Sequence, residues 1–485
     1  MIAARYASAL PVACCLAAVI SLWPSASCTA GDYTLSAHGN TSTGVSRLGL
    51  NTRTTIFDYS TGNCAHCHEQ HASVIGSEPT PTGGPGNYLG MANETGVTNA
   101  EQTLCFYCHG TTAGNNESSG TNDDIKTDID NIAVKPYRHT LTLSETAHRP
   151  TETLADIAAA KHVECTDCHN PHAAGHTKHT KGIVGGNAIV TNSSPLYKAT
   201  GIVPTYTGID PNWGNNTIEY GSYSAIQAVD KEYQICFKCH TRANLNVESW
   251  GTTPPASYAW TDVGMEFNPL NKSHHPVVSA LTGSGSSKLT ATQLSTPWAA
   301  NAGTQTMYCT DCHESDSTIA GPHGSATKWI LAGTNKAWPY TLKSKNGRND
   351  TTVYRTLDTM ESDLGTEEGL FCRNCHPNTK SSSINSAHSR TNHTTTKCVD
   401  CHIRIPHGGR VSRLIAADNS DTYTMPARYT SDGAGLNTGG TNVPYVKEFI
   451  KAASGAGYNA VNCTTSSGCT GGSGHTTTSN GGEEW

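Results

Sequence analysis

The stretch CAHCH at residues 64–68 sets the pattern of the whole chain: two cysteines three positions apart, followed directly by a histidine. The spacing C-x-x-C-H is typical of covalent c-type haem attachment, because two thiols bind the porphyrin edge and the histidine supplies an iron ligand. This spacing occurs seven times and uses fourteen of the 19 cysteines. The sequence therefore predicts seven haem c groups with their irons, rather than a disulfide scaffold or a zinc protein.

The haem-binding residues follow directly from the seven motifs. The cysteines predicted to form thioether bonds are Cys64, Cys67, Cys105, Cys108, Cys165, Cys168, Cys236, Cys239, Cys309, Cys312, Cys372, Cys375, Cys398 and Cys401. The predicted proximal iron ligands are His68, His109, His169, His240, His313, His376 and His402.

The motifs form an internal repeat. A CFxCH-like motif is followed each time by C[TV]DCH, which gives the pairs 105/165, 236/309 and 372/398. CAHCH at 64–68 stands alone in front of them. A histidine after a small residue precedes the second motif of each pair, and a Pro-His dipeptide follows it. The chain therefore consists of one lone haem site and three two-haem units.

The sixth ligand of each iron decides between an electron carrier and an open substrate site. Removing the seven proximal histidines from the total of 23 leaves sixteen. Eight of these recur in the repeated slots and are the distal candidates: His38, His71, His148, His172, His274, His323, His388 and His407. His275 and His393 are near alternatives to His274 and His388. The histidines interpreted as bystanders are His66, His139, His162, His176, His179 and His475. Eight candidates suffice for two histidines on every iron.

Chain reach restricts which iron each distal candidate can serve. His71 follows His68 by three residues, which span about 10 Å at most, too little to pass around a porphyrin to its opposite face. The same limit applies to His172 and His169. We therefore expect distal ligands to be exchanged between motifs.

The predicted fold is a multihaem cytochrome c, mostly coil with short α-helices packed around a chain of seven haems and with little β-sheet. The 47 glycines and the scarcity of periodic apolar runs leave little conventional core, so folding is expected to depend on haem. Capping boxes at Thr98 and Ser224 predict helices that run into CFYCH and CFKCH. The stretches 110–124, 186–222 and 324–352 are predicted loops.

The ends of the chain carry separate predictions. Residues 1–30 have the order of a secretory signal, with lipid attachment at Cys28 as the alternative, and residues 31–410 form the heptahaem region. Residues 411–485 form a C-terminal segment with a helix at 443–453, a flexible tail and a possible disulfide between Cys463 and Cys469. We expect a secreted protein at the outer cell surface or outside the cell, with the periplasm as the alternative. The formal charge of −7 argues against nucleic acid as a partner.

SAHGN from Ser36 and TGNCAHCHEQHAS from Thr61, followed by paired C-x-x-C-H motifs, resemble the exported multihaem cytochromes of metal-reducing bacteria. Among these the chain is similar to outer-surface cytochromes, including those that polymerise into extracellular filaments. The resemblance covers residues 36–407. It implies a continuous stack of bis-histidine haems and a distal ligand that can come from a neighbouring subunit, here His71 or His38.

Two classes of function follow. The first is electron transfer, without enzymatic activity, by a homopolymer that carries electrons from periplasmic or outer-membrane cytochromes to metal oxides or electrodes; a monomeric periplasmic carrier is a variant of it. The second is an oxidoreductase of the nitrite or hydroxylamine type with one open haem. Some such enzymes carry a C-x-x-C-K motif, which this sequence lacks.

We predict seven covalently bound haems per chain, all six-coordinate and low-spin, because every motif supplies a proximal ligand and the repeat supplies distal ones. Mass spectrometry of the intact protein and its pyridine haemochrome spectrum measure the haem count. A count below seven, or a high-spin iron signal at neutral pH, contradicts the prediction.

Overall fold

The computed structural model describes part of the chain. The described residues are 30–46, 59–68, 100–106, 108–110, 124–131, 133–139, 141, 163–179, 181, 190–208, 221–241, 262–271, 273–281, 289–337, 365–366, 369–377, 402, 406–409 and 414. The predicted signal segment, His71, His148, His388, His393 and nearly all of the C-terminal segment lie outside these residues.

The helices are short, and α6 at Tyr233–His240 is the longest of those described. The other α-helices are α1 (Ala30–Leu35), α2 (Ala100–Phe106), α3 (Ile125–Ile129), α5 (Cys165–Cys168) and α7 (Val263–Glu266). Single 3₁₀ turns are η1 (Cys64–His66), η6 (Ala291–Gln293), η7 (Trp298–Asn301), η8 (Cys309–Asp311), η9 (Lys328–Ile330) and η10 (Phe371–Asn374). Several of these turns are the haem motifs themselves.

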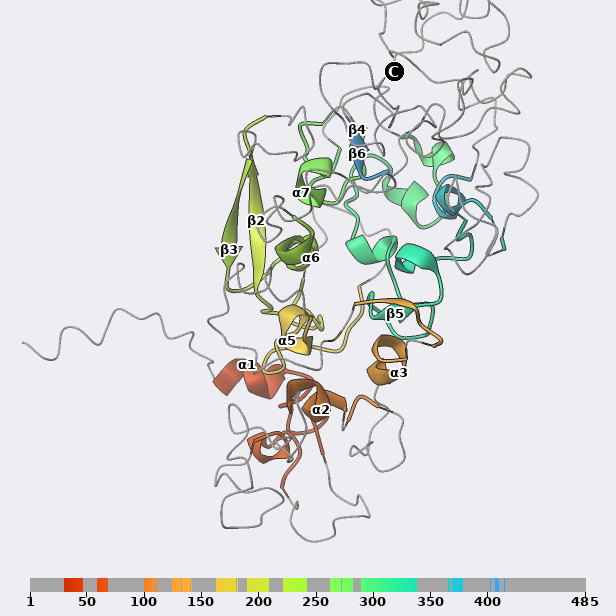
Figure 1. Cartoon of the computed structure of the whole chain (residues 1–485). Coiled ribbons are helices and arrows are strands. Elements are labelled where there is room, and N and C mark those ends of the chain that lie inside the picture. The colour runs from red at the N-terminus through yellow and green to blue at the C-terminus, as the bar shows by residue number, and fades with distance from the viewer. Residues whose placement is uncertain are drawn as a thin grey trace, which may run out of the picture.

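The strands form three separate antiparallel pairs. β2 (Gly201–Tyr206) and β3 (Gly221–Ile226) make the longest ladder, with Gly201 opposite Ile226. β1 (Tyr137–Arg138) pairs with β5 (Gly324–Ser325), and β4 (Ser273–His274) pairs with β6 (Gly408–Gly409). Figure 1 shows β2 and β3 beside α6, whereas the β4–β6 pair lies at the opposite end of the described chain from α1 and α2.

Three local predictions from the sequence are wrong, one of them the loop at 324–352, which contains β5 and η9. Ser224 lies in β3 rather than at a helix start, and α6 begins only at Tyr233. The stretch 186–222, predicted as a loop, contains β2. The Thr and Val residues of β2 favour a pleated strand, and pairing with β3 gave them a partner that local turn residues did not indicate.

The main hydrophobic cluster joins segments from three haem motifs. Phe237 of α6 is fully buried at its centre, and Ile202 of β2 packs beside it. The motif cysteines Cys309, Cys312 and Cys375 pack against the same cluster. The attachment positions of consecutive motifs are therefore collected around one core instead of being spread along the surface.

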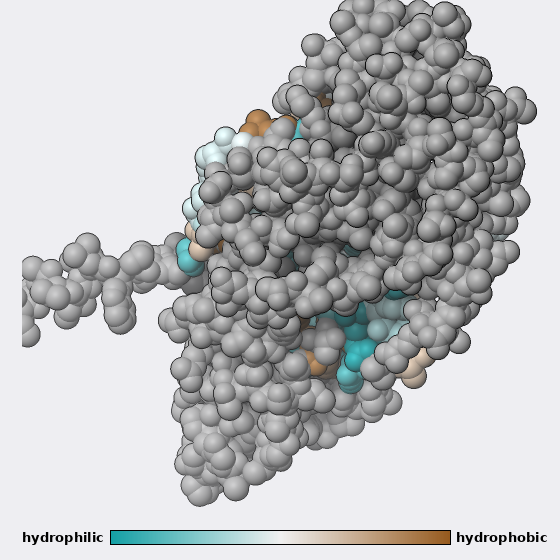
Figure 2. All heavy atoms as spheres, turned by 45° about the horizontal axis from the view of Figure 1, so that its top comes forward, coloured by the Kyte–Doolittle hydropathy of each residue, from teal (hydrophilic) through white to brown (hydrophobic). Residues whose placement is uncertain are grey.

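The surface of the described residues carries scattered apolar side chains. Those that are large and exposed are Leu35, Tyr59, Val134 and Leu270, from four separate segments. On the face in Figure 2, the described residues are visible in small areas, among them a hydrophilic hollow drawn in teal. Within the described chain, no helix has the length and apolarity needed to cross a membrane.

Candidate haem-binding sites

Each described C-x-x-C-H motif is wound into one helical turn. The backbone N–H of the histidine donates to the carbonyl of the first cysteine, as in the 2.9 Å bond from His68 to Cys64. The same bond closes the motifs that start at 105, 165, 309 and 372, and the motif at 236 lies inside α6. One turn of helix places residues three and four positions apart on the same face. Both thiols and the imidazole of each motif can therefore reach one flat group.

The aspartate inside CTDCH has a structural role. The Asp167 carboxylate accepts a 2.8 Å hydrogen bond from the backbone N–H of Glu164, the residue before the motif. Asp311 accepts the same bond, also 2.8 Å, from Tyr308. This reciprocal cap holds the first turn of the motif in helical form. It explains why aspartate recurs before the second cysteine.

Six of the seven proximal histidines face a second histidine from a distant part of the chain. The separations between ring centroids are 5.9 Å for His68 and His172, 6.2 Å for His109 and His38, 6.3 Å for His169 and His323, 6.2 Å for His240 and His139, 6.2 Å for His313 and His407, and 6.5 Å for His376 and His275.

This narrow range of separations fits an iron between the rings. Two metal–nitrogen bonds of about 2 Å on opposite sides of one ion, with about 1.1 Å from each nitrogen to its ring centre, place the centres about 6 Å apart. Rings stacked face to face lie closer, as the 3.8 Å between His179 and Tyr308 shows. Within the described residues, no three His, Cys, Asp or Glu side chains converge as a bare metal ion would need. The histidine pairs therefore suit a haem iron, whose other four ligands come from the porphyrin.

The pairs follow a simple rule along the chain. The three Pro-His histidines, at 172, 323 and 407, each face the proximal histidine of CAHCH or CTDCH in the preceding unit. The histidines at 38, 139 and 275 each face the proximal histidine of the next CFxCH-like motif. Histidines thus reach both backward to the preceding unit and forward to the next one.

Backbone carbonyls orient most of these rings through the second ring nitrogen. The Nδ1 of His38 lies 2.9 Å from the carbonyl oxygen of Pro171, and that of His139 lies 2.8 Å from the oxygen of Pro322. His275 makes the same contact with Pro406. A bond at Nδ1 selects the tautomer whose Nε2 is free to bind a metal. Each Pro-His dipeptide thus orients one distal candidate and supplies another.

Burial lowers the pKa values of several of the paired histidines. Burial, followed by the neighbouring His139, lowers the pKa of His240 to about 4. Burial and then His376 lower that of His275 to about 4, and burial and then His169 lower that of His323 to about 3. The imidazoles of His240, His275 and His323 are therefore neutral at physiological pH, which is the form that binds iron.

The structure departs from the sequence-based choice of distal histidines at two positions. His139, interpreted as a bystander, faces His240, and no described ring contact joins His274 to a proximal histidine whereas His275 faces His376. Both histidines directly follow a short strand, β1 or β4, that pairs with the strand after a Pro-His dipeptide. The sequence offered little signal for this, because KPYRH and NKSHH match only at the final histidine.

Two of the histidines interpreted as bystanders, His66 and His179, contact other protein groups. His66 is buried with its Nε2 3.1 Å from the carbonyl of Ser60, and His179 stacks on Tyr308 with its Nε2 3.4 Å from Asp311. Burial lowers the pKa of His179, but the acidic groups Asp311 and Glu232 outweigh burial and leave it raised. His402 is described, whereas its candidate partners at 388 and 393 are not.

Thiols of successive motifs lie near one another. Hydrogen bonding to Cys236 and burial raise the pKa of Cys309 well above its usual value, and burial followed by the Cys375 thiol raises that of Cys312. The cysteines of the first six motifs are all free thiols in the structure, without a disulfide among them. They remain available for thioether bonds.

Comparisons with protein-family models, with curated proteins and with solved structures found no match for this chain. The assignment of the sites therefore depends on the motifs and on the histidine geometry.

Replacement of His139 by Ala distinguishes the structural assignment from the sequence pattern, which favours His148. We expect H139A to leave one of seven haems five-coordinate and high-spin, because the iron opposite His240 loses its second imidazole. EPR and carbon monoxide binding by the reduced protein measure this. H148A is the matched control and should remain fully low-spin; a high-spin haem in H148A and none in H139A would reverse the assignment.

Proposed function

We propose that the protein is an electron-transfer protein in which seven bis-histidine c-type haems form a continuous chain, and that it acts as a subunit of an extracellular filament. The observation that carries the proposal is the set of six opposed histidine pairs at 5.9 to 6.5 Å. When bound, the haems supply one-electron chemistry. The six histidine pairs would hold the irons of six haems and leave no position on them for a substrate.

Close spacing of the motifs supports transfer between haems. Cys309 lies within hydrogen-bonding range of Cys236, and Cys309, Cys312 and Cys375 pack on the same hydrophobic cluster. Thioether bonds at these positions would hold the edges of three successive porphyrins near one core. Electrons could then pass from one motif to the next through short separations.

The pairing rule also supports assembly into a polymer. Each lone or second-in-pair motif takes its distal histidine from the Pro-His slot of the following unit, up to His407 opposite His313. His402, the histidine of the last motif, is followed by no further C-x-x-C-H motif in residues 403–485, and the one histidine between 408 and 485 is His475. In a second copy, the first unit offers His71 in the equivalent slot. His38, the alternative shared ligand, already faces His109.

Electron transfer is tested directly with purified native protein. Reduced protein should pass seven electron equivalents per chain to chelated ferric iron, because each haem carries one electron. It should neither turn over nitrite or hydroxylamine nor bind carbon monoxide in the assembled state. Stoichiometric carbon monoxide binding together with nitrite turnover would support the oxidoreductase alternative instead.

His71→Ala tests the shared ligand. We expect haem content to stay at seven, filaments to be lost in electron micrographs, and one haem per chain to gain carbon monoxide binding, because the iron opposite His402 loses the partner subunit's imidazole. H475A serves as a control in the tail, and H388A and H393A test ligands from the same chain.

These variants distinguish a distal ligand shared between subunits from a distal ligand supplied by the same chain. Unchanged filaments in H71A would exclude this shared ligand. An open haem in H388A or H393A would instead assign the distal ligand of the last iron to its own chain, as expected for a monomer.

A further inference from the structure

The β1–β5 strand pair and the β4–β6 strand pair have the same local arrangement. In the pair β1–β5, Arg138 lies opposite Gly324, and in the pair β4–β6, His274 lies opposite Gly408. Each glycine directly follows a Pro-His histidine. A Cβ on Gly324 would lie 1.9 Å from the carbonyl oxygen of Asp128, and a Cβ on Gly408 would lie 1.9 Å from that of Glu266. The absence of a side chain thus lets each Pro-His segment pack tightly on a short helix.

The two short helices match as well. Asp124 caps α3 by accepting a hydrogen bond from the Thr127 N–H, and Asp262 caps α7 by accepting one from the Met265 N–H. Asp128 and Glu266 both stand four residues after the capping aspartate. They are therefore equivalent acids beside equivalent histidines, His323 and His407.

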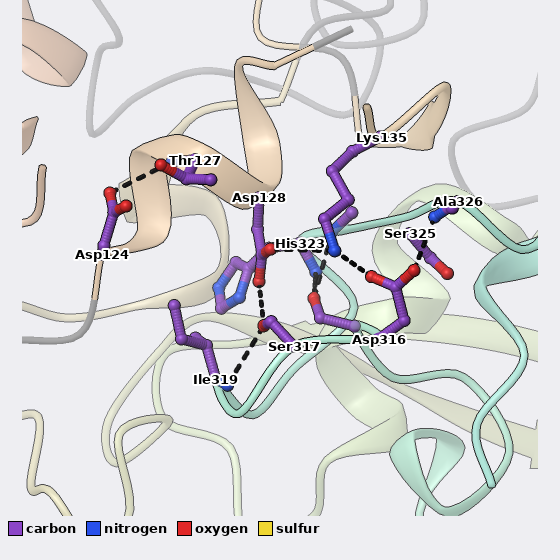
Figure 3. Close-up of polar contacts among 12 residues, drawn as sticks. Asp124, Thr127, Asp128, Lys135, Asp316, Ser317, Ile319, His323, Ser325 and Ala326 are labelled. Atoms are coloured by element: carbon purple, nitrogen blue, oxygen red, sulfur yellow. Dashed lines mark hydrogen bonds and ion pairs between the residues drawn. The ribbon is translucent and has the colours of Figure 1, made fainter. Parts of the chain in front are cut away.

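At the β1–β5 pair, the acid, Asp128, contacts a lysine and a serine. Asp128 forms an ion pair with Lys135 at 3.4 Å and accepts a hydrogen bond from the Ser317 hydroxyl, as Figure 3 shows. Lys135 also pairs with Asp316. The Nδ1 of His323 is buried and has no hydrogen-bond partner within the described chain. Lys135 is thus shared between the carboxylates of Asp128 and Asp316, and Asp128 makes no described bond to the histidine.

At the β4–β6 pair, the acid, Glu266, contacts the histidine, His407, itself. Glu266 is fully buried, and its Oε2 lies 2.5 Å from the Nδ1 of His407. Glutamate is one methylene longer than aspartate, which gives its carboxylate the reach to this ring. The Nδ1 atoms of five other paired histidines contact neutral backbone carbonyls: His38, His139, His169, His275 and His313.

We propose that Glu266 is a positioning residue that lowers the reduction potential of the haem attached to Cys309 and Cys312, relative to the equivalent haem at Cys165 and Cys168. This inference rests on the proposed function, since it requires His407 as the distal ligand. A carboxylate that accepts the Nδ1–H makes the imidazole a more basic ligand. Its buried negative charge also favours the ferric over the ferrous state, because opposite charges interact strongly away from water.

The test is Glu266→Gln in the haem-loaded full chain, followed by EPR-monitored redox titration. Glutamine keeps the size and a hydrogen-bond acceptor but removes the charge. We expect one of seven haems to move to higher potential by at least tenfold in its reduced-to-oxidised ratio, about 59 mV for one electron. Asp128→Asn is the matched control, and its haem should move less because its carboxylate does not bond the ligand.

Glu266→Asp provides a second variant for the case in which glutamine disturbs folding. The shorter carboxylate keeps the charge but withdraws it from Nδ1, so a shift in the same direction and of smaller size is expected. Titration curves that superimpose on wild type in both Glu266 variants, or an equal shift in D128N, overturn the role of Glu266. Haem content and spin state of the wild type are measured in parallel. A wild type without bound haem would instead overturn the proposed function.

Discussion

A histidine that follows two cysteines in C-x-x-C-H can reach only one face of a flat group bound to those cysteines. The turn that closes each described motif, as between Cys64 and His68, leaves the opposite face to another segment. The rest of the structure follows from this restriction. The Pro171 carbonyl that orients His38 lies 133 residues away along the chain, and the Pro322 carbonyl that orients His139 lies 183 residues away.

Contacts between histidine rings and the backbone of distant segments, rather than long helices or large sheets, hold the described part of the chain together. Helices of four to eight residues and two-residue strands would be marginal by themselves, since short helices lack the length to offset nucleation. They are held where they position an imidazole or its carbonyl partner. The three Pro-His segments each perform both tasks, so a few short elements connect all the described units.

Repetition with local variation gives each site its own environment. The β1–β5 and β4–β6 pairs place an acid beside a Pro-His histidine, but Asp128 forms an ion pair with Lys135 whereas Glu266 contacts His407. A chain of similar centres benefits from such differences, because the charge and basicity around each ligand set the order in which the centres accept electrons. In the proposed function, the repeat would supply the electron-transfer path, and substitutions such as Asp128 against Glu266 would give its haems different reduction potentials.

From the sequence alone we predicted the haem attachment positions, the repeat of the motifs and the role of the Pro-His histidines, because covalent attachment needs a fixed local spacing. The sequence predicted the prevalence of short elements but not β2 and β3, whose pairing partner was not visible locally. The placement of His139 opposite His240 and of His275 opposite His376 became visible in the folded chain, since an opposed ring pair depends on distant segments packing together. The contact of Glu266 with His407 required the same knowledge, because 141 residues separate the two side chains.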